Sequence, residues 1–338
     1  MTLVIESTLK PLKDYAYEGI EKHLHKTLKW EKPVKKDEDT EALHQMRVGM
    51  RRLRTAISRF DIALNLPKPA SDQKIGKIAR CLGKLRDLDV LKETLETNYQ
   101  PHLPPKEQEA LKTAFDALAK QRKVAFSKVQ TVLKDEDYKS LKDALSAWLE
   151  EPNYRPLASL PIQQVLPDLL LPEVSKFLLH PGWLVGTKVG DAEVKICTTW
   201  QKKRIEKELI NKGESLHDLR KQAKRVRYQM ELFTELYGES YKAYIEEVKS
   251  IQEILGNMQD SVVMDEWLMD VFKSDFHTDL PTLTNLLKEN RYEYWKQWQP
   301  LQERYLKSEN RHNFHLTILH PMQESSLSSD EPNDEQKN

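Results

Sequence analysis

The stretch LHQMRVGMRRLRTAISRF, residues 43–60, decides the fold, because it recurs as LHDLRKQAKRVRYQMELF at residues 216–233. The matched pairs include His44 and His217, Arg47 and Arg220, Arg52 and Arg225, Arg54 and Arg227, and Phe60 and Phe233. The alignment continues without a gap, so that LGKLRDLDVL at residues 82–91 falls on LGNMQDSVVM at residues 255–264. One offset held over two helical segments indicates duplication of a helical unit.

Both copies carry the apolar spacing of a helix that buries one side. In each copy the apolar residues recur at alternating steps of three and four, the spacing of the buried seam of a bundle helix. The seam of the first copy consists of Leu43, Met46, Met50, Leu53, Ile57, Phe60 and Leu64. That of the second consists of Leu216, Leu219, Ala223, Val226, Met230, Phe233 and Tyr237.

The whole composition favours helices. The chain of 338 residues contains 31% charged residues and only 10 glycines, and Leu, Lys, Glu, Ala and Gln fill its long segments. The patterns predict helices over residues 8–30, 40–65, 71–99, 104–133, 135–150, 192–211, 214–238, 240–273 and 280–309. We therefore predict an all-α fold of two pseudo-symmetric helical bundles that arose from the duplication.

The predicted bundles occupy residues 1–151 and 192–322. Prolines and glycines crowd between them, so residues 152–191 are interpreted as an ordered linker with room for short helices. Residues 323–338 carry five acidic side chains against Lys337 and almost no apolar ones. A segment of that composition buries too little surface to offset its ordering entropy, and we expect an acidic, disordered tail.

A basic stripe runs beside each apolar seam. His44, Arg47, Arg51 and Arg54 step by three, four and three, each one residue round from a seam position, and His217, Arg220, Lys224 and Arg227 repeat the pattern. From residue 44 to residue 60 the first copy holds five arginines and no acid. Because a row of like charges on one helix face repels itself, the stripes predict an anionic ligand. Arginine suits phosphate, since its planar fork donates paired hydrogen bonds and stays charged.

Two alternatives accompany the stripes. Acidic residues of other helices could neutralise them, because the chain as a whole holds 53 acidic and 53 basic side chains. The two histidines could also be neutral residues that hold a helix start, although a bound phosphate would favour their charged form.

These motifs resemble the CHAD family, the conserved histidine α-helical domain, over residues 5–315. The resemblance rests on the two H-x-x-R-x-x-x-[RK]-R-x-R stretches and on LGKLRD and LGNMQD. It implies two four-helix bundles around a basic central cavity, binding of inorganic polyphosphate, and association with polyphosphate granules. The binding residues that it implies are His44, Arg47, Arg51, Arg52, Arg54, His217, Arg220, Lys221, Lys224, Arg225 and Arg227, with Tyr228 beside them.

Further basic residues are secondary candidates for contact with the ligand. They are Arg86 in the first L-G-x-x-x-D segment, Arg122, Lys123 and Lys128 on one predicted helix, and Lys203 and Arg204 before the second stripe. Basic runs of this kind are more often solvated faces. Gln259 and Asn257 stand in the second copy where the first has Arg86 and Lys84, so the predicted cavity is charged unevenly.

Other classes of function find less support. The chain has no P-loop, no H-E-x-x-H and no G-x-S-x-G motif, so we expect a binding protein without catalysis, cofactor or metal. Asp87 and Asp260 are expected to pair with stripe arginines or to bind helix starts rather than a metal ion. One alternative is binding of an RNA backbone or another polyanion, although the basic stripes lack the interleaved aromatic residues that would stack on bases. The other is a helical scaffold for a protein partner, which the sequence does not identify.

The expected location is the cytoplasm. The two cysteines, Cys81 and Cys197, form no paired motif, and the first thirty residues lack an apolar signal-peptide core. No segment approaches the roughly 20 apolar residues that span a bilayer.

Overall fold

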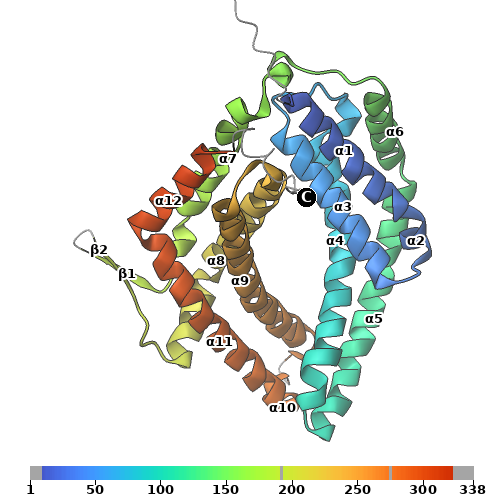
Figure 1. Ribbon diagram of the computed structural model, residues 1–338. Helices are drawn as coiled ribbons and strands as arrows, with labels where there is room; N and C mark the ends of the chain where they lie inside the picture. The colour runs from blue at the N-terminus through green and yellow to red at the C-terminus, as the bar shows by residue number, and fades with distance from the viewer. Residues whose placement is uncertain (1–9, 191–192, 274–275, 323–338) are drawn as a thin grey trace, which may run out of the picture.

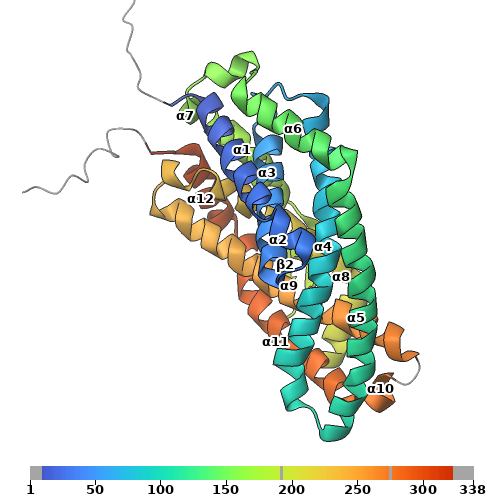
Figure 2. The same cartoon turned by 90° about the vertical axis from the view of Figure 1, so that its right-hand side faces the viewer.

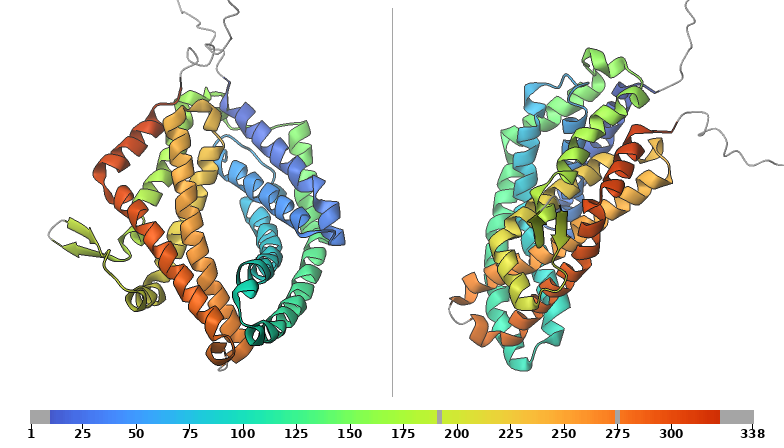
Figure 3. Two further views of the ribbon diagram at one scale, coloured as in Figure 1. Left: turned by 60° about the horizontal axis from the view of Figure 1, so that its bottom comes forward. Right: turned by 90° about the vertical axis from the view of Figure 1, so that its left-hand side faces the viewer.

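The computed structural model describes residues 10–190, 193–273 and 276–322, and these are mostly helical (Figure 1), which confirms the predicted all-α class. The helices are α1 (Leu12–Lys29), α2 (Glu31–Lys36), α3 (Thr40–Arg59), α4 (Asp72–Thr94), α5 (Pro105–Lys134), α6 (Glu136–Glu150), α7 (Ile162–Leu178), α8 (Lys202–Glu231), α9 (Glu239–Phe272), α10 (Phe276–Asp279), α11 (Pro281–Leu306) and α12 (Ser308–Leu319). Two short strands, β1 (Thr187–Gly190) and β2 (Glu193–Ile196), pair antiparallel. Their hairpin projects from the helices (Figure 3).

The helices form two groups. In the first, α3 packs between α1 and α4, and α4 packs along α5 (Figure 2). In the second, α9 packs between α8 and α11, and α7 and α12 cover one end. Every residue of the two predicted seams is buried, from Met46 at 0% exposure to Leu216 at 3%. The three-four spacing therefore identified the inner edges of α3 and α8 correctly.

The two groups touch at two separate places. At one, α3 meets α8, where the Phe60 and Phe233 rings pack edge to face with their centroids 5.7 Å apart. At the other, α5 meets α9, and the indole nitrogen of Trp267 donates a hydrogen bond of 3.0 Å to Gln121 Oε1. The groups are thus held together at both ends of the space that separates them.

A buried carboxylate also joins the groups. Glu107 of α5 is only 4% exposed, and its two oxygens accept hydrogen bonds from the backbone amides of Thr282 (3.0 Å) and Leu283 (3.1 Å) at the start of α11. The first amides of a helix have no partner inside the helix. Glu107 satisfies two of them and places a negative charge at the positive end of the α11 dipole.

Several predicted elements differ in the structure. Residues 152–191 include α7, a helix of 17 residues despite Pro167 and Pro172, because Leu166, Leu170 and Phe177 are buried at helical spacing. That burial offsets the hydrogen bonds that the prolines remove. The two helices predicted at 192–211 and 214–238 are one continuous helix, α8, so the predicted break between them is wrong, as is the predicted start, because residues 193–196 form β2. Helix α12 follows the predicted last helix. The division into domains remains a prediction, and the predicted acidic tail, 323–338, lies outside the described residues.

Replacing Glu107 by alanine should destabilise the fold. Glu107→Ala leaves two amides at the start of α11 unsatisfied, and we expect the free energy of unfolding to fall by about 1–3 kcal/mol. Urea denaturation measures the change. The matched control is Glu109→Ala on the same helix, where the exposed Glu109–Lys112 pair contributes little, about 0.5 kcal/mol or less. Equal losses in both variants would contradict the capping role.

Candidate functional site

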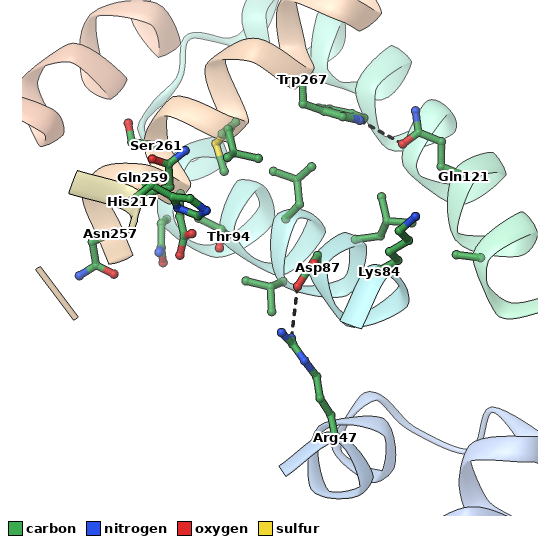
Figure 4. Close-up of a pocket in the computed structure, with 18 of the residues that line it drawn as sticks. Arg47, Lys84, Asp87, Thr94, Gln121, His217, Asn257, Gln259, Ser261 and Trp267 are labelled. Carbon is green, nitrogen blue, oxygen red and sulfur yellow. Dashed lines mark hydrogen bonds and ion pairs between the residues drawn. The ribbon is translucent and has the colours of Figure 1, made fainter. Parts of the chain in front are cut away.

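A cavity of about 1150 Å³ lies between the two groups of helices. Figure 4 shows part of its lining, and its walls come from α3, α4, α5, α8, α9 and α11. Five residues of the two basic stripes line it: Arg47, Arg51, His217, Arg220 and Lys224. The two stripes therefore contribute residues to one cavity, and α3 and α8 meet beside it at Phe60 and Phe233.

The arginine of each H-x-x-R motif lies against the L-G-x-x-x-D segment of the next helix. A Cβ atom at Gly83 would lie 3.7 Å from Arg47 Nε, and one at Gly256 would lie 3.1 Å from Arg220 Nε. The 3.1 Å approach is tighter than an ordinary van der Waals contact, so glycine at position 256 makes room for the guanidinium. The aspartate one turn later then pairs with the arginine. Arg47 Nη1 lies 3.2 Å from Asp87 Oδ1, and Arg220 Nη2 lies 3.5 Å from Asp260 Oδ1.

Arg51 and Lys224 are the stripe cations that keep no acidic partner. Among the residues that the structure describes, neither has a carboxylate oxygen within 4.0 Å. The Arg51 guanidinium instead lies over the Tyr228 ring, with Cζ 4.2 Å from the centroid, and its Nε is buried without a hydrogen-bond partner. This cation–π contact leaves the positive charge uncompensated.

The charges around Lys224 act on its protonation. Burial, followed by the positive charges of Arg51 and Arg47, lowers the pKa of the Lys224 ammonium from 10.5 to about 7. The site therefore holds an ammonium group that is close to losing its proton at neutral pH, and a nearby anion would favour its charged form.

The two histidines lie beside this cluster. The pKa values of His44 and His217 are lowered, mainly by burial, so both imidazoles are mostly neutral at pH 7. His217 lies in the middle of α8, so it does not hold a helix start, and its buried Nδ1 has no hydrogen-bond partner among the described residues. His44 follows the start of α3 but is absent from the cavity lining.

The remaining cations of the stripes, and those beside them, are neutralised by acidic residues of the protein. This contradicts the expectation of two stripes free of acids. Arg54 donates two hydrogen bonds, of 2.7 and 2.9 Å, to Asp72. Glu231 lies within ion-pair distance of both Arg52 (3.5 Å) and Arg227 (3.6 Å). The other pairs are Arg225 with Glu173 at 3.7 Å and Lys221 with Asp218 at 2.8 Å. The Lys221–Asp218 and Arg227–Glu231 pairs lie within α8, and the other pairs join different helices.

The secondary candidates lie mostly outside the cavity. Arg122 donates hydrogen bonds of 2.7 Å to both oxygens of Asp37 and one of 2.7 Å to the buried Asp89. Its guanidinium therefore links α5 to α4 and to the residues before α3. Arg86 lies 3.6 Å from Glu93. Lys123, Lys203 and Arg204 are exposed and do not line the cavity, and Tyr228 is buried beneath Arg51.

The wall opposite the stripes contains lysines, of which Lys120 was not singled out from the sequence. Lys84 of α4 and Lys120 of α5 line the cavity, together with the secondary candidate Lys128. The lining residues Lys120, Val124 and Lys128 of α5 follow each other at steps of four and so lie on one face, whereas Lys123 lies about 140° round the helix from Lys128. This spacing could have been recognised in the sequence, but only the packing of α5 against α4 and α9 shows that this face of α5 lines the cavity.

Nothing in the described ranges offers a bilayer-crossing helix, since none combines the necessary length with sufficient apolar character.

Comparisons with known proteins agree with the helical architecture. The model of the CHAD domain family matches residues 18–269. The chain is 25% identical over 262 residues to an uncharacterized protein of Mycobacterium tuberculosis, found in strains CDC 1551 and H37Rv. The match covers 77% of this chain and 46% of that protein, so the chain spans about half the length of these relatives.

Two solved structures share the fold. The crystal structure of the CHAD domain from the plant Ricinus communis is 21% identical, with a TM-score of 0.56 over 95% of this chain and 97% of that one. PptA from Streptomyces chartreusis is 14% identical, with a TM-score of 0.60 over 87% of this chain and 100% of that one. At these identities the likeness shows the fold alone.

The crowding of cations around Lys224 should be visible in its titration. We expect the Lys224 pKa in NMR spectra of labelled lysine side chains to lie near 7. Arg51→Gln removes a positive neighbour and should raise that pKa, while Arg204→Gln, outside the cavity, should leave it unchanged. A wild-type value near 10.5, or one that Arg51→Gln does not move, would show that the two groups are not in electrostatic contact.

Proposed function

The chain belongs to the CHAD domain family, and on this premise we propose that it binds inorganic polyphosphate in the cavity between its two groups of helices. One observation carries the proposal. Arg51 from α3 and Lys224 from α8 line the same cavity, and neither makes an ion pair within the described part of the chain. An anion between them would supply the missing negative charge.

The number of cations favours a chain of phosphates over a single one. Arg47, Arg220 and the opposite-wall lysines Lys84, Lys120 and Lys128 line the same cavity as Arg51 and Lys224. One phosphate group can contact only a few of these side chains, whereas a chain can contact successive ones. Arginine forks bind phosphate oxygens in pairs, and the lysines act as point charges.

Two carboxylates make the site selective for long chains. Asp87 and Asp260 hold Arg47 and Arg220 and line the same cavity, so an incoming anion has to compete with them. A short anion that binds one arginine gains little beyond what the aspartate already supplies. A long chain contacts many cations at once, and its affinity should rise with its length because the later contacts are intramolecular.

The alternatives are RNA and an acidic protein. Both carry negative charge, but the unpaired cations lie in a cavity between helices rather than on a protruding surface, which favours a narrow, unbranched ligand. The role that we propose is binding without catalysis. A protein that binds long polyphosphate would collect on polyphosphate granules, and this location belongs to the same proposal.

The test removes the two unpaired charges. In the double variant Arg51→Gln, Lys224→Gln, we expect the dissociation constant for long-chain polyphosphate, measured by calorimetric titration, to rise about hundredfold, since each charged hydrogen bond contributes about 1.5–3 kcal/mol. The matched control is Lys112→Gln, Lys139→Gln, which removes two exposed charges outside the cavity lining and should change the constant about twofold at most.

Thermal unfolding separates loss of binding from loss of structure. The double variant lacks two cations that repel their neighbours, so its unfolding midpoint should equal or exceed that of the wild type. Unchanged affinity in a folded double variant would refute the proposal. Displacement of bound polyphosphate by RNA of equal charge, at equal concentration, would favour the RNA alternative instead.

A further inference from the structure

Besides its lysines, the cavity wall away from the stripes carries exposed apolar side chains. Val90 of α4, Val124 of α5 and Val263 of α9 line it with 38%, 57% and 46% of their surfaces exposed. Three exposed valines from three helices on one cavity form an apolar surface that an inorganic phosphate chain does not use. Apolar walls with a few placed polar groups are typical of sites for organic ligands.

Aromatic rings lie beside these valines. Trp267, Tyr99 and Tyr294 line the cavity from α9, from the π-helical turn after α4 and from α11. In Figure 4, Trp267 and Gln121 lie at one end of the pocket, Arg47 lies at the other, and Lys84 and Asp87 lie between them. The hydrogen bond from the Trp267 indole nitrogen to Gln121 fixes the orientation of the ring. The indole is therefore a prepared flat surface within a cavity whose other end is cationic.

Amide side chains complete the lining. Asn98 and Asn290 belong to it, and Asn290 donates a hydrogen bond of 2.9 Å to the Tyr99 hydroxyl, whereas Asn257 and Gln259 lie beside His217 (Figure 4). Amides both donate and accept hydrogen bonds, as do the edges of nucleobases. A purely aliphatic group would use the valines but would make no hydrogen bond to these amides.

We infer that the cavity takes a nucleoside polyphosphate, with its phosphates between Arg51 and Lys224 and its base against Trp267 and the exposed valines. The phosphate half of this inference rests on the proposed function, and the base half rests on the apolar and aromatic end alone. Stacking of a base on an aromatic side chain is tolerant of base identity. We therefore expect adenine and guanine nucleotides to bind alike.

The first experiment compares ATP with inorganic tripolyphosphate, which carries a similar charge without a nucleoside. In calorimetric titrations of the wild type, ATP should bind about tenfold more tightly than tripolyphosphate. Val124→Ser should abolish this preference and leave the affinity for tripolyphosphate unchanged. The matched control is Ile210→Ser, a β-branched residue that is 83% exposed on α8 and absent from the lining, and it should keep the preference.

A second measurement does not depend on affinity. ATP at saturation should quench tryptophan fluorescence in the wild type, and Trp267→Phe should remove most of the quenching while the protein stays folded. A prenyl diphosphate, compared with inorganic diphosphate, serves as the aliphatic control. If the prenyl group increases affinity over inorganic diphosphate as much as adenosine increases it over tripolyphosphate, the assignment of the apolar end to a base is overturned.

The outcomes separate the two proposals. If long polyphosphate binds but ATP binds no more tightly than tripolyphosphate, the nucleotide inference is wrong and the proposed function stands. If ATP binds with the expected preference and long polyphosphate does not bind, the proposed function is wrong and the inference stands. If neither ligand binds, both are wrong.

Discussion

The packing of α3 against α8 is the constraint on which the rest of the structure depends. The two seams are buried, and Phe60 meets Phe233 where the helices approach each other. This contact brings two rows of like charge to one cavity, because each row lies one residue round from its seam. Burial and, after it, this repulsion lower the pKa of Lys224. Apolar burial stabilises an arrangement that electrostatics alone would oppose, and the opposing charges become available to an anion.

The same contact explains why two motifs occur together. The H-x-x-R arginine reaches across to the L-G-x-x-x-D helix, where a glycine leaves space and an aspartate one turn later accepts the charge. The aspartates hold Arg47 and Arg220 on the cavity wall. They also compete with an anionic ligand for these arginines, so the ligand has to bind more strongly than the aspartates do. Arg51 and Lys224, one turn further along, have no such partner among the described residues. The site thus combines cations that are held in place with cations that are left free.

The sequence predicted the parts of this site that depend on local spacing. The seams and the stripes follow from steps of three and four residues; the structure buries both seams and brings five of the stripe residues to one cavity. The local sequence could not show that Asp72 and Glu173 neutralise Arg54 and Arg225, because these acids arrive from other helices. It could not show α7 either, since the burial of Leu166 and Leu170 against distant elements outweighs two prolines. The apolar end of the cavity likewise depends on the packing of α5 against α9.

The most direct test of the central claim counts protons. Above pH 7 Lys224 is largely neutral in the free protein, and a phosphate bound beside it should raise its pKa and draw a proton from solution. Titration calorimetry with long-chain polyphosphate at about pH 8.5, in buffers of different ionisation enthalpy, measures this uptake. The account predicts that the wild type takes up close to one proton more than Lys224→Arg, whose side chain is already charged. Equal uptake by the two proteins would contradict the claim that phosphate binds between Arg51 and Lys224.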